Sequence, residues 1–323
     1  MQGPPTFLLS PPRSGSTLLA RILGAHSNVH APNELHLLQP LYHLGYFGVV
    51  DSVGKGFTED PNYHPEIVAS AARDVVRQLP RGEADYLDAL RAYTDTIYQR
   101  LLAASGKRVL IDKSPMYLRY ADFLMKLYPS APMICLTRHP LAVGTSFNHM
   151  SSDLGLWKEL LPEQLFALYA DRDTAAFVRR SMRIFAAGMT RALRNDRLTK
   201  IHVKYEDVVA NPTATMARIC AFLDLPFEPD MIHYGKHAPV APQGQLLGDP
   251  YVVHNHDRPV DGYQQKWMKT LAERKDGREF AHDILGCFTD DDLDAWGYDR
   301  ATIVKEIDSI PSGAGNGHDA TTD

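Results

Sequence analysis

Short apolar runs alternate along the chain with longer stretches of helical periodicity. Four of these runs are apolar on both faces, which is typical of strands buried in a parallel sheet; they cover residues 6–9, 109–111, 133–137 and 201–204. Elsewhere apolar residues recur every three to four positions and predict helices over residues 18–26, 66–78, 86–104, 118–127, 163–193 and 213–223. This alternation predicts an α/β fold in which helices flank a central, mostly parallel sheet.

The loop after the first predicted strand has the composition of an anion site. Pro11 and Pro12 interrupt the apolar run, and small polar residues then lead into a helix. Converging loop N–H groups and a helix N-terminus attract an anion, and Arg13 adds a full positive charge. The residues that this prediction assigns to phosphate binding are Arg13, Ser14, Gly15, Ser16, Thr17 and Leu18.

The same loop lacks the G-x-x-x-x-G-K-[S/T] pattern of a Walker A loop. A single glycine, Gly15, lies between two serines, and Arg13 precedes the loop, whereas a Walker lysine would end it. The pattern therefore favours a terminal 5′-phosphate over a metal-bound triphosphate. Taken alone, the loop is equally compatible with an ordinary strand-to-helix turn.

Two further cations follow the next predicted strands. Lys113 could hold a bridging or leaving oxygen, or it could form a salt bridge with Asp112 or face solvent. Arg138 leaves the third strand, and Ser146 lies about two turns into a helix that Pro140 begins. Arg138 and Ser146 can thus reach one anion from two directions, and a planar guanidinium suits a phosphate. Two anion sites on strand ends predict a ligand with two separated anionic groups, because ligands of such sheets bind at the carboxyl ends of the strands.

Tyr205 follows the fourth predicted strand in the segment Tyr205-Glu206-Asp207. An aromatic ring at the end of a strand can stack on a nucleotide base. In the alternative interpretation, Tyr205 belongs to the core, while Glu206 and Asp207 cap a helix.

In this order, the segments resemble the sulfotransferases that use 3′-phosphoadenosine 5′-phosphosulfate (PAPS) as the donor. The resemblance covers about residues 6–210 and implies a P-loop-like, three-layer sulfotransferase fold without a metal. It implies that residues 12–17 hold the 5′-phosphosulfate and that Arg138 and Ser146 hold the 3′-phosphate. It also implies that Tyr205 lies at the nucleotide.

One branch of the family is more similar than the others. Arg13 in place of a lysine, together with Glu34 and Lys113, looks like the tyrosylprotein and bacterial types. The segments at residues 34–38, 112–117 and 138–140 look most like the sulfotransferase domains of polyketide synthases. Those domains act on a β-hydroxyacyl chain carried on an acyl carrier protein, which the resemblance implies as the acceptor and partner. A free small molecule, a glycan or a glycolipid stays open as the acceptor.

Sulfuryl transfer requires in-line positioning, a base for the acceptor hydroxyl and a cation at the leaving oxygen. Glu34 is the predicted base, because a short loop after the first helix allows it to return to the anion site. Arg13 and Lys113 would flank the sulfonate and the leaving oxygen, and their charge would lower the pKa of Glu34. His36 is the rival base.

The chain departs from the family in its last third. Residues 274–276 differ from the basic R-K-G segment of cytosolic members, and Gln265 stands where tyrosylprotein types have a serine before K-W. The contacts of this part with a 3′-phosphate therefore stay open. Lys266 and Trp267 are expected to anchor a loop by packing.

The length of 323 residues is compatible with one sulfotransferase domain over residues 1–310. Within it, residues 35–104 form a mainly helical insert on the acceptor side. Residues 238–263 form a long loop, which predicts a lid. Residues 311–323 are rich in Gly, Ser, Asp and Thr and predict a disordered tail or linker.

The composition limits the kinds of binding partner and the cellular location that the sequence supports. The net charge of −5 gives no general attraction to nucleic acid or to anionic membranes, and 44% hydrophobic residues is a globular value. No apolar run is long enough to span a membrane. The three cysteines are far apart, which favours a reducing compartment, and no secretory signal is apparent, so the predicted location is cytoplasmic.

Two alternatives come from other functional classes. A kinase-like nucleotide phosphotransferase would require the Walker lysine and a magnesium carboxylate after a strand, and the sequence supports neither. A nucleotide-binding module without catalysis would not require Arg13, Glu34 and Lys113 together.

Overall fold

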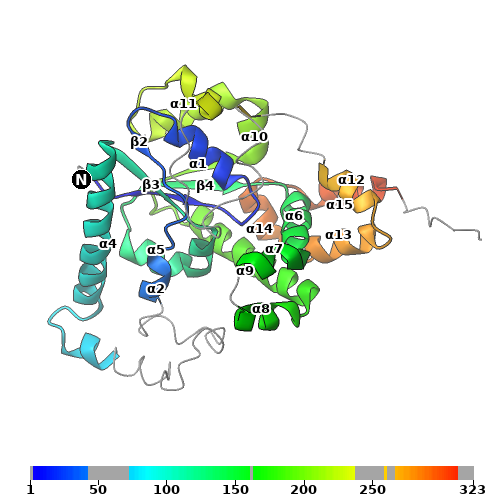
Figure 1. The fold of residues 1–323 in the computed structure, drawn as a ribbon, viewed down its shortest axis with the longest axis horizontal. Coiled ribbons are helices and arrows are strands. Elements are labelled where there is room, and N and C mark those ends of the chain that lie inside the picture. The colour runs from blue at the N-terminus through cyan, green and yellow to red at the C-terminus, as the bar shows by residue number, and fades with distance from the viewer. Residues whose placement is uncertain (1–2, 43–72, 161–162, 237–257, 260–265, 312–323) are drawn as a thin grey trace, which may run out of the picture.

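The computed structural model describes residues 3–42, 73–160, 163–236, 258–259 and 266–311. Its strands pair in parallel in the order β2-β3-β1-β4-β5 (Figure 1). The predicted α/β fold with a parallel sheet between helices is therefore confirmed. The strands are β1 (Thr6–Leu9), β2 (Val29–His30), β3 (Val109–Lys113), β4 (Met133–Thr137) and β5 (Lys200–Lys204).

Alternating strand residues contribute to two cores, one on each face of the sheet. Leu8 packs on one side, where the covering elements are α1 (Ser16–Gly24), α10 (Tyr205–Ala210), α11 (Pro212–Phe222) and the 3₁₀ helix η4 (Pro229–Lys236). Phe7 and Leu9 pack on the other side. The elements there are α4 (Glu83–Ser105), the 3₁₀ helix η3 (Pro115–Tyr120), α5 (Ala121–Leu127), α6 (Pro140–Ser152) and α9 (Thr174–Arg194).

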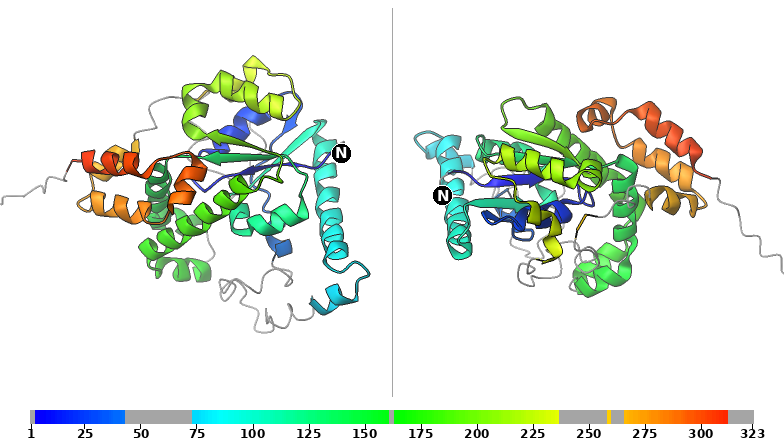
Figure 2. Two further views of the ribbon diagram at one scale, coloured as in Figure 1. Left: turned by 180° about the vertical axis from the view of Figure 1, so that it is seen from behind. Right: turned by 90° about the horizontal axis from the view of Figure 1, so that it is seen from above.

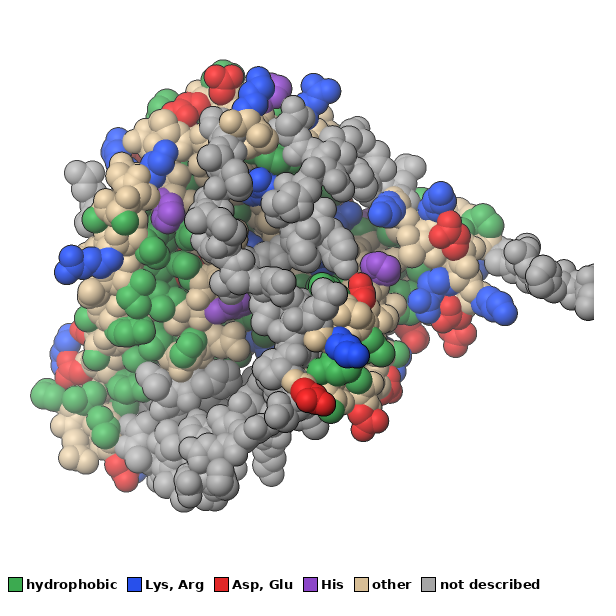
Figure 3. Space-filling view, in the orientation of Figure 1, with side chains coloured by type: hydrophobic (Ala, Val, Ile, Leu, Met, Phe, Trp, Pro, Cys, Tyr) green, Lys and Arg blue, Asp and Glu red, His purple; other side chains and the backbone are tan. Residues whose placement is uncertain are grey.

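The remaining helices pack around these elements, and several of them contribute buried residues to the core that contains Phe7. They are α2 (Leu38–Tyr42), α7 (Leu154–Leu160), α8 (Glu163–Ala170), α12 (Lys266–Ala272), α13 (Gly277–Leu285), α14 (Asp290–Trp296) and α15 (Arg300–Ser309). We call α12, α13, α14 and α15 the C-terminal helices. They gather beside α6 (Figures 1 and 2). Their outer surface mixes both charges (Figure 3), whereas Trp267 and Trp296 are buried.

Three sequence predictions need correction. The two-residue strand β2 was not predicted, because Val29 and His30 are too short a run to give a pattern. The single helix predicted over 163–193 is two helices. The first ends at Ala170, and Asp173 caps the second by accepting a hydrogen bond from the Ala176 N–H. The helix predicted over 118–127 begins as the 3₁₀ helix η3.

The predicted insert over residues 35–104 is helical where it is described, at α2, residues 73–78 and α4. Residues 43–72, nearly all of the predicted lid at 238–263 and residues 312–323 lie outside the described residues. None of the described helices has both the length and the apolar character that crossing a membrane requires.

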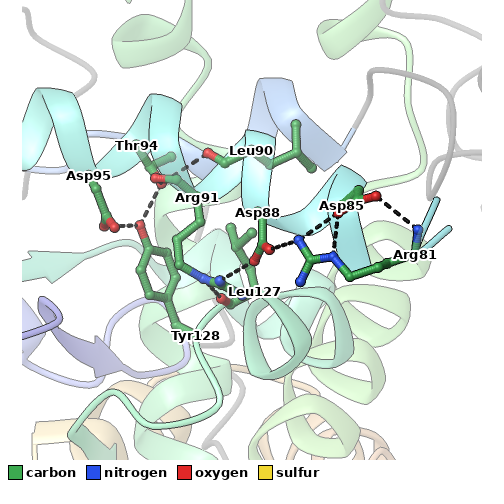
Figure 4. Close-up of polar contacts among 9 residues, drawn as sticks. All are labelled: Arg81, Asp85, Asp88, Leu90, Arg91, Thr94, Asp95, Leu127 and Tyr128. Atoms are coloured by element: carbon green, nitrogen blue, oxygen red, sulfur yellow. Dashed lines mark hydrogen bonds and ion pairs between the residues drawn. The ribbon is translucent and has the colours of Figure 1, made fainter. Parts of the chain in front are cut away.

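Polar contacts fix α4 against α5 (Figure 4). Arg91 donates from Nε to the Leu127 carbonyl oxygen at 2.7 Å. The Tyr128 hydroxyl lies 2.8 Å from the Asp95 carboxylate and 2.5 Å from the Thr94 hydroxyl. Because α4 is held in this way, a later residue of the same helix, Tyr98, reaches Asp112 of β3.

We predict that Gly188→Ala destabilises the protein. A Cβ at position 188 would overlap the Leu118 carbonyl oxygen, where α9 crosses η3, so the backbone must shift at a cost of about 1–3 kcal/mol. Urea titrations would measure the free energy of unfolding. Gly155→Ala in α7 is the control, since a Cβ there would lie at the ordinary contact distance of 3.4 Å from its nearest neighbour. We expect this variant to gain up to about 1 kcal/mol from the higher helix propensity of alanine. Equal stability of the two variants would contradict the close packing of α9 on η3.

Candidate active site

The loop between β1 and α1 has an unusual backbone that suits anion binding. Arg13 (φ 67°) and Gly15 (φ 87°) both adopt the left-handed conformation, and α1 begins at Ser16. A Cβ at Gly15 would overlap the Tyr205 ring, so only glycine fits at this point. The loop therefore lies between the start of α1 and Tyr205, with its N–H groups near the positive end of a helix.

Lys113 and Glu34 form a buried ion pair at the carboxyl end of β3. The Lys113 ammonium lies 2.8 Å from Glu34 Oε1 and 3.4 Å from the Thr17 hydroxyl. Lys113 is opposite Leu8 in the register of β3 with β1, which brings it beside the loop. Glu34, which comes from the segment after β2, is thus held close to the loop between β1 and α1 through Lys113.

The carboxylate of Glu34 is held from two sides. Its second oxygen, Oε2, lies 3.2 Å from His36 Nε2. Burial raises the pKa of Glu34, but the hydrogen bond from His36 and the charge of Lys113 outweigh burial and hold this pKa below its usual value. Glu34 is therefore ionised at neutral pH. The sequence predicted a lowered pKa from Arg13 and Lys113, whereas His36 and Lys113 produce it.

Both ring nitrogens of His36 have partners. Nδ1 lies 3.0 Å from the Ser114 hydroxyl, which also accepts a hydrogen bond from the Met116 N–H. The Ser114 hydroxyl can donate to Nδ1 or accept from it, and Nε2 lies toward Glu34. His36 thus lies between Ser114 and Glu34 and orients the carboxylate of Glu34. Its backbone is left-handed, with φ 49°.

Arg13, Arg138 and Ser146 also lie together. Arg13 donates from Nε to the Ser146 hydroxyl at 3.1 Å, and Arg138 donates from Nη1 to the Arg13 carbonyl oxygen at 3.0 Å. The Arg138 guanidinium lies 4.3 Å from the centre of the Tyr205 ring. Residues that the sequence placed after three different strands are thus connected by direct contacts. The sequence did not predict that Arg13 contacts Ser146.

Buried hydroxyl groups test whether this arrangement fits a doubly phosphorylated nucleotide. The hydroxyl of Ser14, in the loop, and that of Thr145, in α6, are buried and have no hydrogen-bond partner in the part of the chain that the structure describes. An unpaired buried hydroxyl is destabilising, and an added acceptor would satisfy it. The two groups lie in the same two elements as the predicted ligands of the 5′- and 3′-phosphates. The donors and cations present therefore fit such a ligand.

Asp112 has a role that sequence reasoning missed. The sequence offered Asp112 as one alternative partner of Lys113, and this alternative is wrong, because neighbouring residues of a strand point to opposite faces. Asp112 instead accepts hydrogen bonds from the hydroxyls of Tyr98 (2.5 Å) and Tyr117 (2.7 Å). The alternation of side chains along a strand was enough to predict that Asp112 and Lys113 point to opposite faces of the sheet. The result is a fully buried carboxylate that ties α4 and η3 to β3.

No group of three or more His, Cys, Asp or Glu side chains suited to a metal ion occurs among the described residues.

Residues 4–229 match the family model described as "Sulfotransferase family". The chain belongs to the sulfotransferase family. The family predicted from the motifs is therefore confirmed, and with it the sulfotransferase fold. The C-terminal helices of this sulfotransferase lie outside the matched region.

Curated relatives include the nodulation protein NoeE of Sinorhizobium fredii, which is 33% identical over 226 residues, 67% of this chain and 49% of NoeE. Protein-tyrosine sulfotransferase A of Caenorhabditis elegans is 21% identical over 280 residues, 83% of this chain and 62% of that protein. The chain thus spans about half the length of NoeE.

Solved structures similar to this chain include two sulfotransferase domains. The sulfotransferase domain of the Synechococcus PCC 7002 olefin synthase is 27% identical, with 82% of this chain and 87% of that domain covered and a TM-score of 0.47. The sulfotransferase domain of the curacin biosynthetic pathway is 22% identical, with 87% and 96% covered and a TM-score of 0.46.

We predict that Asp112→Asn removes a pH dependence from the stability of this sulfotransferase. Burial raises the pKa of Asp112 from 3.8 to about 6, so the folded state keeps a proton that the unfolded chain releases near pH 4. Ionisation of Asp112 therefore destabilises the folded state as the pH rises from about 4 to about 6, by about 3 kcal/mol. Denaturant titrations at several pH values should show the variant gaining this amount relative to the wild type.

Asp276→Asn is the control of opposite sign. Hydrogen bonds from Arg274 hold the pKa of Asp276 below its usual value of 3.8, so its ionisation stabilises the folded state. The variant should therefore lose stability relative to the wild type as the pH rises towards that usual value. A stability difference between Asp112→Asn and the wild type that is constant from pH 4 to 7 would show that Asp112 is not held in its protonated form.

Proposed function

We propose that this chain transfers the sulfuryl group of PAPS to an acceptor hydroxyl. The observation that carries the proposal is the set of contacts among groups from separate strand ends: Arg13 with Ser146, Arg138 with the Arg13 carbonyl, and Lys113 with Thr17. A site with cations on both sides of one loop suits a ligand with two anionic groups. Membership of the sulfotransferase family favours sulfuryl transfer over the kinase-like alternative.

The proposed donor site extends from the loop to α6. The loop N–H groups, the start of α1 and Lys113 would hold the 5′-phosphosulfate, and Arg138 and Ser146 the 3′-phosphate. When bound, PAPS supplies the sulfuryl group, and 3′-phosphoadenosine 5′-phosphate is the product. The residues proposed to contact the donor are Arg13, Ser14, Gly15, Ser16, Thr17, Leu18, Arg138, Ser146 and Tyr205.

Glu34 is the proposed base. Lys113 holds Glu34 Oε1 in an ion pair. When the ammonium turns to a nearby anion, Oε1 becomes free to accept a proton. The acceptor hydroxyl then gives its proton to Glu34 and its oxygen bonds to sulfur, while the electron pair of the broken S–O bond stays on the 5′-phosphate oxygen. Lys113 stabilises the charge that develops on that oxygen.

The partners of His36 favour it as the positioning residue for this base. Nδ1 lies 3.0 Å from the Ser114 hydroxyl and Nε2 lies 3.2 Å from Glu34 Oε2, so both ring nitrogens already have protein partners. His36 then keeps Glu34 oriented and lowers the pKa of its carboxyl.

The proposed acceptor is the β-hydroxyl of an acyl chain on an acyl carrier protein. The support is the resemblance of the segments at residues 34–38, 112–117 and 138–140 to polyketide-synthase sulfotransferase domains. A free small molecule, a glycan or a glycolipid is the second candidate acceptor. A reducing, cytoplasmic location is part of the proposal, and Cys135, Cys220 and Cys287 are all free thiols.

The direct test supplies PAPS with labelled sulfate and no added metal to the purified chain. β-Hydroxyacyl carrier protein, a sugar and a phenol are offered as acceptors in parallel reactions. We expect label on the β-hydroxyacyl carrier protein. Label on the sugar or the phenol alone would replace the proposed acceptor. Transfer from ATP in the presence of Mg²⁺, with none from PAPS, would refute the sulfotransferase activity.

We predict that Glu34→Gln lowers kcat at least about 100-fold, because a general base contributes about 10² to 10⁴ in rate. Its amide oxygen can still accept the Lys113 hydrogen bond, so affinity for 3′-phosphoadenosine 5′-phosphate should change less than about threefold. His36→Ala should lower kcat less, since it removes only the orientation of Glu34. Steady-state kinetics and calorimetric titration would measure both effects.

Glu83→Gln, which loses a surface ion pair with Lys126, is the matched control and should keep full turnover. Nearly full turnover of Glu34→Gln, together with loss of activity in His36→Ala, would assign the base to His36 instead.

A further inference from the structure

His139 occupies the point where the two proposed ligands of the 3′-phosphate meet. It directly follows Arg138, and it precedes Pro140, the first residue of α6, which carries Ser146. Its side chain is only 13% exposed. A shift of His139 would therefore move Arg138 and the start of α6 together.

Three segments of the C-terminal region hold the His139 ring. The ring stacks on Trp267 of α12 with the centroids 4.8 Å apart and an interplanar angle of 10°. Tyr298, between α14 and α15, meets it edge-on at 5.6 Å. His139 Nε2 lies 2.9 Å from Glu306 Oε2 of α15. These contacts fix the side-chain torsions of His139 from outside the sheet.

The backbone of His139 is held through Glu206. The His139 N–H donates to Glu206 Oε1 at 3.0 Å, and the Tyr298 hydroxyl donates to Glu206 Oε2 at 2.9 Å. Glu206 directly follows Tyr205, over whose ring the Arg138 guanidinium lies. The Tyr298 hydroxyl therefore acts through one carboxylate on both the first turn of α6 and the support of Arg138.

The C-terminal helices also contact α6 directly. A Cβ at Gly144, two residues before Ser146, would overlap the Ile284 side chain of α13. Helices α12 and α13 both pack against α6. The C-terminal helices thus contact both elements that carry the proposed 3′-phosphate ligands.

We infer that the C-terminal helices determine the preference of this enzyme for a 3′-phosphorylated nucleotide, with His139 and Tyr298 as positioning residues for Arg138. The inference rests on the proposed function. A guanidinium fork binds a phosphate well only when its orientation is fixed in advance. A nucleotide without a 3′-phosphate makes no use of that orientation, so the C-terminal helices contribute to affinity for one ligand and not for the other.

The test compares 3′-phosphoadenosine 5′-phosphate with adenosine 5′-monophosphate as ligands of the purified chain by calorimetric titration. Tyr298→Phe removes only the hydroxyl group, which donates to Glu206 and also has a hydrogen bond with Thr137. We expect this variant to bind 3′-phosphoadenosine 5′-phosphate about tenfold more weakly, with less than about a twofold change for adenosine 5′-monophosphate. Glu306→Gln, which weakens the contact with His139 Nε2, should change the ratio of the two affinities in the same direction.

Thr190→Val is the matched control. It also removes one hydroxyl donor from a carboxylate, since Thr190 of α9 donates to Asp292 of α14 at 2.6 Å, but it has no contact with His139. The melting temperature should fall in both variants, whereas the ratio of the two affinities should change only in Tyr298→Phe.

Equal weakening of both ligands in Tyr298→Phe, or an unchanged ratio in Tyr298→Phe and Glu306→Gln, would overturn the inference and leave the proposed function intact. The same holds if Thr190→Val changes the ratio as much as Tyr298→Phe does. A wild-type chain that binds both nucleotides equally well would overturn the proposed function and this inference together. If Tyr298→Phe does not fold, Glu306→Gln decides the matter on the same ratio.

Discussion

A buried ammonium group needs a negative partner, and the pairing of Lys113 with Glu34 is the constraint on which the site depends. Only 2% of the Lys113 side chain is exposed, so without Glu34 its charge would carry a large desolvation cost. The pair ties the segment after β2 to the end of β3 and brings a carboxylate beside Thr17. The Glu34 carboxylate that stabilises the buried ammonium is therefore also the group assigned to catalysis as the base.

A second constraint concerns the loop itself. The left-handed backbone at Arg13 and Gly15 lets the chain turn tightly from β1 into α1, and Tyr205 fills the space that any larger residue than Gly15 would need. The ring of Tyr205 also carries the guanidinium of Arg138. The same aromatic side chain thus shapes the loop and supports a cation beside it. This double role explains how groups far apart in sequence keep a fixed geometry.

The local pattern of apolar and polar residues predicts most of the sheet and part of the site, but it does not predict the remaining contacts. Four strands are apolar on both sides and long enough to recognise, whereas residues 29–30 are not. Glu34 could be predicted to approach Lys113 because only a short loop separates it from the first predicted helix, while Lys113 follows a predicted strand. The tyrosine partners of Asp112 and the contacts of His139 could not, because they join segments distant in sequence through single side chains. Such contacts depend on how α4 and the C-terminal helices pack, which no local periodicity encodes.

A crystal structure of the chain with 3′-phosphoadenosine 5′-phosphate tests most directly whether these cations serve one ligand. The account predicts the 5′-phosphate against the N–H groups of residues 14–17 and Lys113. It predicts the 3′-phosphate between Arg138 and Ser146, where it replaces the hydrogen bond from Arg13 to Ser146. A nucleotide bound elsewhere, or held by only one of its two phosphates, would contradict the account.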